Sequence, residues 1–367
     1  MVARVYSQTQ APQQQRQSTP GSGSKPSHNV VCIGEALFDL IADQKGVPRD
    51  KVTSWSAYAG GAPCNVATAL SRLGVAVTFV TALGDDERGT QLLNLCKERG
   101  VLMHAAQVLK GAPTRDVYVV RDNDGDREFA GFGRPTESYS DCFLDANSIP
   151  AEEISAATVL VTGTLGLAYP GSRDSLTRAA DACRAAGSSC RLIVDVNWRP
   201  VFWGDADQAR VTVLAYLEKA SLIKISDSDL EWLLGVGLEE AMGDPCKILD
   251  RFPAAMGVMV TAGARGATYC VHAGPKSSVS GTVESFKVDT VDTTGAGDAF
   301  TAGFIYKLLE AGSLEQLAAD PRAMRAAVVF AAAAGALTTT RPGAIESQPT
   351  LGEVRALVRE RVPEREQ

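Results

Sequence analysis

The amino-acid sequence predicts an α/β fold: a three-layer α/β/α, doubly wound, mostly parallel sheet with a small β-sheet lid. Two observations predict the layers, because short apolar runs recur along the chain and amphipathic helical patterns separate them. A third observation predicts the lid, because one segment with a strand-turn-strand pattern interrupts this alternation.

The apolar runs are the predicted strands. The first, at residues 30–33, is apolar at every position, which is typical of a parallel strand covered by helices on both faces. Similar runs lie at residues 77–80, 159–161, 192–196, 222–225 and 258–261. Helical patterns lie at residues 62–73, 89–99, 172–186, 206–218, 321–336 and 351–361. Ligands of such sheets bind beyond the carboxyl ends of the strands, so we expect the functional residues in the loops that follow them.

The interrupting segment predicts an antiparallel hairpin. Residues 115–121 and 127–132 are strand-like, and the Asp-Asn-Asp-Gly-Asp sequence between them is a strong turn signal. Together with residues around 51–58 the hairpin would form the lid, which we place at about 43–60 and 110–135 of a single domain over residues 30–360. An edge hairpin of the main sheet is the alternative.

The two ends of the chain are predicted to be flexible. Residues 1–29 are rich in Gln, Ser, Pro and Gly and contain no acidic residue, which is typical of a disordered tail and also of an organelle transit segment. The plastid stroma and the cytoplasm are therefore both open as locations. Residues 361–367 form a short flexible C-terminus.

Composition excludes several classes of protein. The chain has 36 Lys and Arg against 43 Asp and Glu, a net charge of −7, and no basic stripe, which disfavours nucleic acid as a partner. No apolar run approaches the roughly 20 residues that span a bilayer. Only three histidines are present and none lies in a motif, so zinc chemistry and Ser-His-Asp catalysis lack their usual residues. Any general base must be a carboxylate, a lysine or a tyrosine.

The cysteines give no sign of a disulfide framework or a metal site. They lie in apolar or helical surroundings without a CxxC pair, so we expect reduced, buried thiols. The eight are Cys32, Cys64, Cys96, Cys142, Cys183, Cys190, Cys246 and Cys270.

A turn of small residues precedes the helical pattern that starts near residue 299. Gly295, Ala296 and Gly297 leave backbone N–H groups uncovered, and the positive end of the following helix points at the same place. One interpretation is a phosphate cradle with Asp298 beside it as a base. The other is an ordinary glycine-rich helix start capped by Asp298, and this segment alone does not decide between them.

Three other loops follow predicted strands or begin predicted helices. Gly60 and Gly61 form a turn that allows close backbone approach, and Asn65 would offer a donor and an acceptor suited to hydroxyl groups, although such a turn on its own is more often structural. Residues 34–39 follow the first strand, and residues 261–266 follow a late one. The sequence has no Gly-Lys dipeptide, His-Arg-Asp or Asp-Phe-Gly, so a Walker A loop and a protein kinase are excluded. A Rossmann G-x-G-x-x-G is also missing after the first strand.

Taken together, these segments resemble the ribokinase-like (PfkB) carbohydrate kinase family over roughly residues 30–359. Gly-Gly-Ala-Pro-x-Asn-Val-Ala at 60–67 and Asp-Thr-Thr-Gly-Ala-Gly-Asp at 292–298 are similar to the two family signatures, and the first resembles the fructokinase branch. Residues 195–200 resemble that branch's Asp-Pro-Asn-x-Arg segment, with Val196 in place of proline. The resemblance implies a ribokinase-like fold and an ATP-dependent sugar kinase, with D-fructose as the first candidate substrate.

The resemblance also assigns roles by position. It implies Asp298 as the catalytic base and the backbone of Gly295, Ala296 and Gly297 as an anion hole. Sugar contacts fall on Asp39, Gly60, Gly61, Asn65 and Arg199. Nucleotide contacts fall on Thr261, Gly263, Gly266, Ser226 and Asp229. Mg²⁺ would arrive with ATP, and a monovalent cation, K⁺ in the first instance, would lie near Asp292, Thr294, Thr338, Gly343 and Ser347.

Two features leave alternatives open. The family's Asn-x-x-Glu element is Ser226-Asp227-Ser228-Asp229 here, and this change with the transit-like tail admits a non-catalytic, fructokinase-like plastid scaffold. Kinases for ribose, 2-keto-3-deoxygluconate, adenosine or a sugar phosphate are further alternatives. The lid of relatives often forms a dimer contact, so a homodimer through the lid is one expectation. The hairpin also carries many charges, among them Arg115 and Arg127, so a solvated face is an equal alternative and the oligomeric state stays open.

Overall fold

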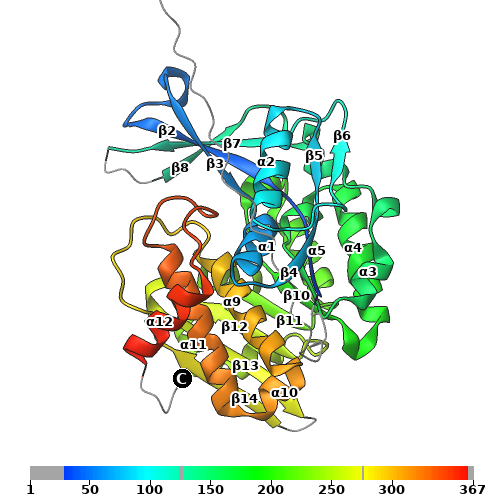
Figure 1. Ribbon diagram of the computed structural model, residues 1–367, viewed down its shortest axis with the longest axis vertical. Coiled ribbons are helices and arrows are strands. Elements are labelled where there is room, and N and C mark those ends of the chain that lie inside the picture. The colour runs from blue at the N-terminus through cyan, green and yellow to red at the C-terminus, as the bar shows by residue number, and fades with distance from the viewer. Residues whose placement is uncertain (1–28, 124–126, 275–276, 363–367) are drawn as a thin grey trace, which may run out of the picture.

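The computed structural model describes residues 29–123, 127–274 and 277–362. Its central element is an eight-stranded sheet of order β14-β13-β12-β11-β10-β9-β1-β4, shown in Figure 1. All pairs from β12 to β4 are parallel, and β13 and β14 are added antiparallel at one edge. The strands are β1 (Asn29–Ile33), β4 (Ala76–Val80), β9 (Val159–Thr162), β10 (Arg191–Asp195), β11 (Leu222–Ser226), β12 (Gly257–Thr261), β13 (Ala267–Gly274) and β14 (Ser277–Val283). The predicted mostly parallel sheet is confirmed, while the antiparallel pair at its edge was not predicted.

Helices cover both faces of this sheet, because the parallel strands are apolar on both sides. One layer contains α1 (Ala62–Arg72), α2 (Glu87–Glu98), α9 (Ala296–Ala311), α10 (Leu314–Ala319), α11 (Pro321–Thr338) and α12 (Leu351–Arg361). The other contains α3 (Ala151–Ala156), α4 (Pro170–Ala185), α5 (Ala206–Leu217), α6 (Asp227–Leu234), α7 (Leu238–Gly243) and α8 (Pro245–Leu249). The three-layer arrangement is therefore as predicted.

The lid is a separate four-stranded sheet of order β3-β2-β7-β8 that projects beside the main sheet (Figure 1). It consists of β2 (Leu37–Lys45), β3 (Trp55–Gly60), β7 (Arg115–Arg121) and β8 (Arg127–Phe132). The bounds of β7 and β8 are those of the predicted hairpin, so the alternative of an edge hairpin on the main sheet is wrong. The sequence interpretation missed β2, whose first residues read as a ligand loop after β1. A small parallel pair, β5 (Ala82–Gly84) with β6 (Gln107–Leu109), lies apart from both sheets.

One lid charge that the sequence placed on a solvated face is fully buried. The Nε of Arg115 donates to Asp141 Oδ2 at 2.7 Å and its Nη2 donates to Asp141 Oδ1 at 2.8 Å. Four aromatic rings surround the guanidinium at 4.5 to 5.5 Å, those of Phe132, Tyr139, Tyr169 and Phe202. Arginine suits this place because its planar guanidinium binds a carboxylate bidentately and stacks on rings. The pair fixes the base of the lid to the loop after β8.

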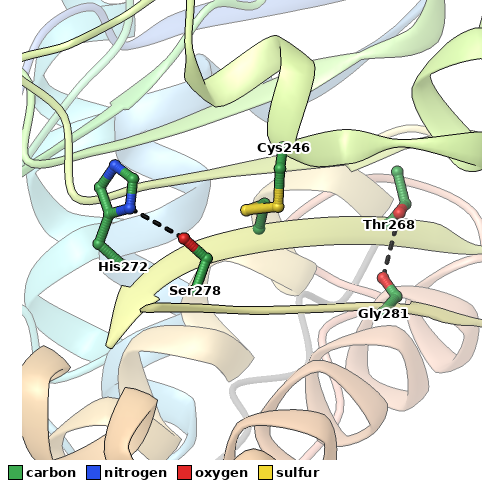
Figure 2. The surroundings of a disulfide bond; sticks show 6 residues. Cys246, Thr268, His272, Ser278 and Gly281 are labelled. Atoms are coloured by element: carbon green, nitrogen blue, oxygen red, sulfur yellow. Dashed lines mark hydrogen bonds between the residues drawn. A yellow bond between two sulfur atoms is a disulfide. The ribbon is translucent and has the colours of Figure 1, made fainter. Parts of the chain in front are cut away.

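A disulfide between Cys246 on α8 and Cys270 on β13 contradicts the expectation that all eight cysteines are reduced (Figure 2). The two residues are 24 positions apart, and they meet because α8 packs on the antiparallel strand that the sequence did not predict. The six other cysteines are free and buried, as expected.

The predicted tails lie outside the described residues, except for Asn29, which begins β1, and residues 361–362. Among the residues that the structure describes, no helix is both long and apolar enough to cross a bilayer.

We predict that Asp141→Asn destabilises the protein by about 3 to 5 kcal/mol, because it leaves the buried Arg115 guanidinium without its counter-ion. Urea denaturation measures this change. The control is Glu239→Gln, which removes an ion pair between Glu239, 80% exposed, and Arg265, 51% exposed, and it should leave the denaturation midpoint nearly unchanged because exposed ion pairs are screened by water. Equal effects of the two substitutions would contradict the assignment of Arg115 as a buried anchor.

Candidate active site

The two glycine-rich turns of the sequence meet in space. The side chain of Asn65, in the first turn of α1, donates from Nδ2 to Asp298 Oδ2 at 2.8 Å, across 233 residues of sequence. Asp298 lies in the first turn of α9. The N-termini of α1 and α9 therefore point at one place beyond the carboxyl ends of the parallel strands, where ligands of such sheets bind.

Glycine is required at the N-caps of both helices. Gly61 has φ 101° and Gly295 has φ 79°, a region that other residues rarely adopt. A Cβ at Gly61 would lie 2.5 Å from the carbonyl oxygen of Glu35, and a Cβ at Gly295 would lie 2.8 Å from the Cβ of Ala344. Each turn therefore needs glycine both for its backbone conformation and for its close packing on the neighbouring loop. This geometry fits either interpretation of the second turn, the anion cradle or the ordinary helix start.

The surroundings of Asp298 raise its pKa to about 6. Burial is the main cause, and the charge of Asp195 adds to it, while the hydrogen bond from Asn65 and the charges of Lys224 and Arg199 oppose the increase. The carboxylate is thus ionised at neutral pH, and its pKa lies close to the working range of a general base.

The structure adds Lys224, a site residue that the sequence interpretation missed. It lies on β11, is 5% exposed, and its Nζ is 3.1 Å from both carboxylate oxygens of Asp195. A Cβ at Gly297 would lie 2.9 Å from this Nζ, so the ammonium sits directly beneath the first turn of α9. Burial lowers the pKa of Lys224, but the charges of Asp195 and Asp298 outweigh it and raise the pKa. The signal in the sequence is a single lysine inside the apolar run at 222–225.

Asp39 lies on the other side of Asn65, on lid strand β2. A Cβ at Gly60 would be 3.3 Å from Asp39 Oδ2, which places the carboxylate against the Gly60-Gly61 turn. Burial raises the pKa of Asp39 to about 6, against the charges of Arg127 and Arg199. The exposed Arg199 therefore lies near the predicted sugar residues, although its Nη1 donates to the carbonyl of Trp198 at 2.7 Å.

The predicted nucleotide residues follow β11 and β12, two neighbouring strands. Thr261 ends β12, Gly263 begins the short 3₁₀ helix Gly263–Arg265, and Gly266 has φ 92°. Ser226 caps α6, its Oγ accepting from the backbone N–H of Asp229 at 3.1 Å. The buried carboxylate of Asp229 accepts from the backbone N–H of Trp198 at 3.0 Å, so one oxygen of this predicted nucleotide residue already holds the loop that carries Arg199.

Four of the five residues predicted to hold a monovalent cation are joined by hydrogen bonds. Asp292 Oδ1 accepts from the N–H and the hydroxyl of Thr294 at 3.0 and 2.7 Å. Asp292 Oδ2 accepts from the N–H of Gly343 at 2.8 Å, and the carbonyl of Gly343 accepts from the hydroxyl of Ser347. The hydroxyl of Thr338, by contrast, donates to the carbonyl of Ala334 in its own helix at 3.0 Å.

The fit of a cation to this set is partial. Carbonyl and hydroxyl oxygens suit a hard monovalent ion. The Asp292 carboxylate, however, also accepts from Nη2 of the lid residue Arg127 at 2.9 Å, which occupies the last of its usual acceptor positions. Within the described ranges, no group of three or more His, Cys, Asp or Glu side chains is placed to hold a metal.

The chain is similar to known proteins over most of its length. The sequence matches the profile of a family described as pfkB family carbohydrate kinase over residues 27–351. It is 34% identical to Fructokinase-1 of Zea mays over 329 residues, which are 90% of this chain and 97% of that protein.

Two solved structures are similar over most of both chains. The fructokinase of Xylella fastidiosa with bound ATP has a TM-score of 0.80 and 28% identity, and the match covers 92% of this chain and 100% of that one. The fructokinase of Vibrio cholerae O395, in a fructose, ADP and calcium ion bound form, has a TM-score of 0.74 and 28% identity, covering 90% and 99%.

We predict that Lys224→Met raises the pKa of Asp298 above about 6, because it removes a cation that lowers this pKa and leaves the charge of Asp195 unbalanced. NMR titration of the carboxyl carbon of Asp298 measures the shift. Lys219→Met, which affects a surface pair with Asp181, is the control and should leave the titration unchanged. The double variant Asp195→Asn with Lys224→Met keeps the local charge balanced and should bring the pKa back toward that of the wild type. An unchanged titration in Lys224→Met would contradict the assignment.

Proposed function

Because the chain belongs to the pfkB family of carbohydrate kinases, which transfer a phosphoryl group to a sugar hydroxyl, we propose that it is an ATP-dependent fructokinase. Its reaction would convert D-fructose to fructose 6-phosphate. The observation that carries this proposal is the hydrogen bond between Asn65 and Asp298, because it unites the proposed sugar turn with the proposed phosphate turn. The relatives named fructokinase, one of them with bound fructose, support the choice of sugar.

In the proposed reaction Asp298 takes the proton of the attacking hydroxyl group as the oxygen of the sugar forms its bond to the γ-phosphorus of ATP and ADP leaves. A carboxylate with a pKa of about 6 is ionised at neutral pH and still basic enough for this transfer. The N–H groups of Gly295, Ala296 and Gly297 would stabilise the charge on the phosphoryl oxygens. Lys224 would add positive charge from beneath the same turn.

The sugar would bind between the lid and the first turn of α1. The carboxylate of Asp39 and the amide of Asn65 can read hydroxyl positions through paired hydrogen bonds, with the backbone of Gly60 and Gly61 beside them. Arg199 would close the pocket from the loop after β10, where its charge already acts on Asp39 and Asp298.

ATP would bind along the loops after β11 and β12, against Thr261, Gly263 and Gly266. Mg²⁺, when bound with ATP, neutralises phosphate charge and keeps most of its waters. Ser226 and Asp229 face this region, and Asp229 has one carboxylate oxygen left for a magnesium-bound water. A K⁺ ion near Asp292 stays a prediction.

The remaining expectations also stay predictions. They are a homodimer through the lid, the lack of a nucleic-acid or membrane partner, and a location in the plastid stroma or the cytoplasm.

A coupled ADP-release assay with Mg²⁺ and K⁺ tests the proposed function. We expect kcat/KM to be highest with D-fructose among D-fructose, ribose, 2-keto-3-deoxygluconate and adenosine. A higher value with another sugar would move the proposal to that substrate. No turnover with any acceptor would instead support the scaffold alternative.

We predict that Asp298→Asn lowers kcat by roughly 10²- to 10⁴-fold, the usual contribution of a positioned general base, while fructose and ATP still bind. Steady-state kinetics and isothermal titration measure the two properties. Asp207→Asn, in the exposed first turn of α5, is the matched control and should retain wild-type kcat. Retention of wild-type turnover in Asp298→Asn would remove Asp298 as the base.

We predict that Asp39→Ala weakens fructose binding by roughly tenfold or more, because a half-buried carboxylate that would accept sugar hydroxyls is lost, with little effect on ATP affinity. Calorimetric titration with each ligand separates the two affinities. The sugar pocket is misplaced if the fructose affinity of the variant equals that of the wild type.

A further inference from the structure

A lid arginine reaches across the site to the segment before α9. Arg127, the first residue of β8, donates from Nη2 to Asp292 Oδ2 at 2.9 Å and from Nη1 to Thr294 Oγ1 at 2.7 Å. The contacts join residues 165 and 167 positions apart. Both acceptors, Asp292 and Thr294, belong to the five residues near which the family resemblance placed a monovalent cation.

The carboxylate of Asp292 is nearly closed to solvent, because its side chain is 5% exposed. It accepts four hydrogen bonds from three residues, and among these described donors Arg127 alone carries a charge. The buried negative charge is thus balanced by a residue of the lid and not by one of the main domain.

A second lid residue contacts the same place. A Cβ at Gly343 would lie 3.1 Å from the ring of Tyr58 on β3, so the lid also covers the loop that donates to Asp292. Gly295, the cap of α9, packs in turn on Ala344 of that loop. The charge of Arg127 also acts on Asp39, the proposed sugar residue: burial raises the pKa of Asp39, and the positive charge of Arg127 opposes that increase. The guanidinium therefore lies between the proposed sugar carboxylate and the proposed phosphate turn.

We propose that Arg127 is a positioning residue: with the lid closed, its guanidinium is the counter-ion of Asp292 in place of a monovalent cation and holds the turn at 292–295 in its phosphate-binding form. The positive charge at Asp292 then arrives with lid closure, which couples the covering of the sugar to the formation of the anion hole. The enzyme needs little monovalent cation while Arg127 is present.

The kinetic test rests on the proposed sugar kinase activity. Initial rates at saturating fructose and MgATP are compared in KCl and in tetramethylammonium chloride of equal concentration, because tetramethylammonium screens charge without coordinating oxygen. We expect the wild-type rate to differ by less than about twofold between the salts, since their ionic strengths are equal. Arg127→Ala should lose roughly 5- to 150-fold in kcat in tetramethylammonium, the usual span of coupling between two sites, and regain most of it in KCl. The control is Arg121→Ala, which removes a lid arginine that binds the backbone carbonyls of Ala42 and Asp43. Its kcat should be the same in the two salts.

A second measurement does not depend on activity. In the protein without substrates, KCl should raise the thermal midpoint of Arg127→Ala relative to tetramethylammonium chloride and leave that of the wild type unchanged, because only the variant has an uncompensated Asp292. A wild-type enzyme that requires K⁺, or an Arg127→Ala variant that K⁺ neither stabilises nor reactivates, overturns the proposal. If no sugar is phosphorylated at all, the proposed function fails, and the thermal experiment still decides the role of Arg127.

Discussion

The ammonium of Lys224 is the charge on which the centre of this protein depends. Asp195 lies close enough to Asp298 for its charge to raise the pKa of Asp298, and the charge of Asp229 raises the pKa of Asp195 in the same way. In a low-dielectric interior two such carboxylates do not both ionise near neutral pH unless a cation lies close to them. Lys224 is bound to both oxygens of Asp195 and lies under Gly297, so it meets this need from the strand side. The requirement for glycine at 297 follows from the same contact, because a larger residue would displace the ammonium.

Two arginines connect the lid to the rest of the protein, one near each end of the hairpin strands. Arg115 fixes the start of β7 to Asp141 inside an aromatic cage, and Arg127 fixes the start of β8 to Asp292. The first pair is wholly buried and serves as a permanent anchor, since breaking it would leave a charge without water or counter-ion. The second is 36% exposed on the arginine side, so the cost of separating it is smaller. A lid anchored firmly at one end and loosely at the other can open and close about its base, which is what a kinase that must exclude water requires.

The sequence predicted the parts of this structure whose signal is local. The apolar runs predicted the parallel strands. The two glycine turns on their own did not show that Asn65 and Asp298 are neighbours, and only the family resemblance placed both residues in one site. Lys224 was missed because a single lysine in an apolar strand does not form a recognisable motif, and its partner Asp195 lies on a different strand. The burial of Arg115 could not be predicted, because it depends on aromatic residues up to 87 positions away. The disulfide was missed for the same reason, since Cys246 and Cys270 meet only through the packing of α8 on β13.

The altered Ser226 to Asp229 element has a physical explanation in the loop that it contacts. Asn197 is the one described residue other than glycine with a positive φ, at 40°, and this strained position needs support from its neighbours. Asp229 supports it by accepting a hydrogen bond from the backbone N–H of Trp198. The ring of Trp198 also stacks on the ring of Trp232, which lies on the same helix as Asp229, with 3.7 Å between the two ring centroids. A glutamate carries its carboxylate one methylene further out, so aspartate at 229 suits a group that must stay against a backbone N–H. The element therefore holds the loop that carries Arg199 in place, through the hydrogen bond between Asp229 and the backbone N–H of Trp198.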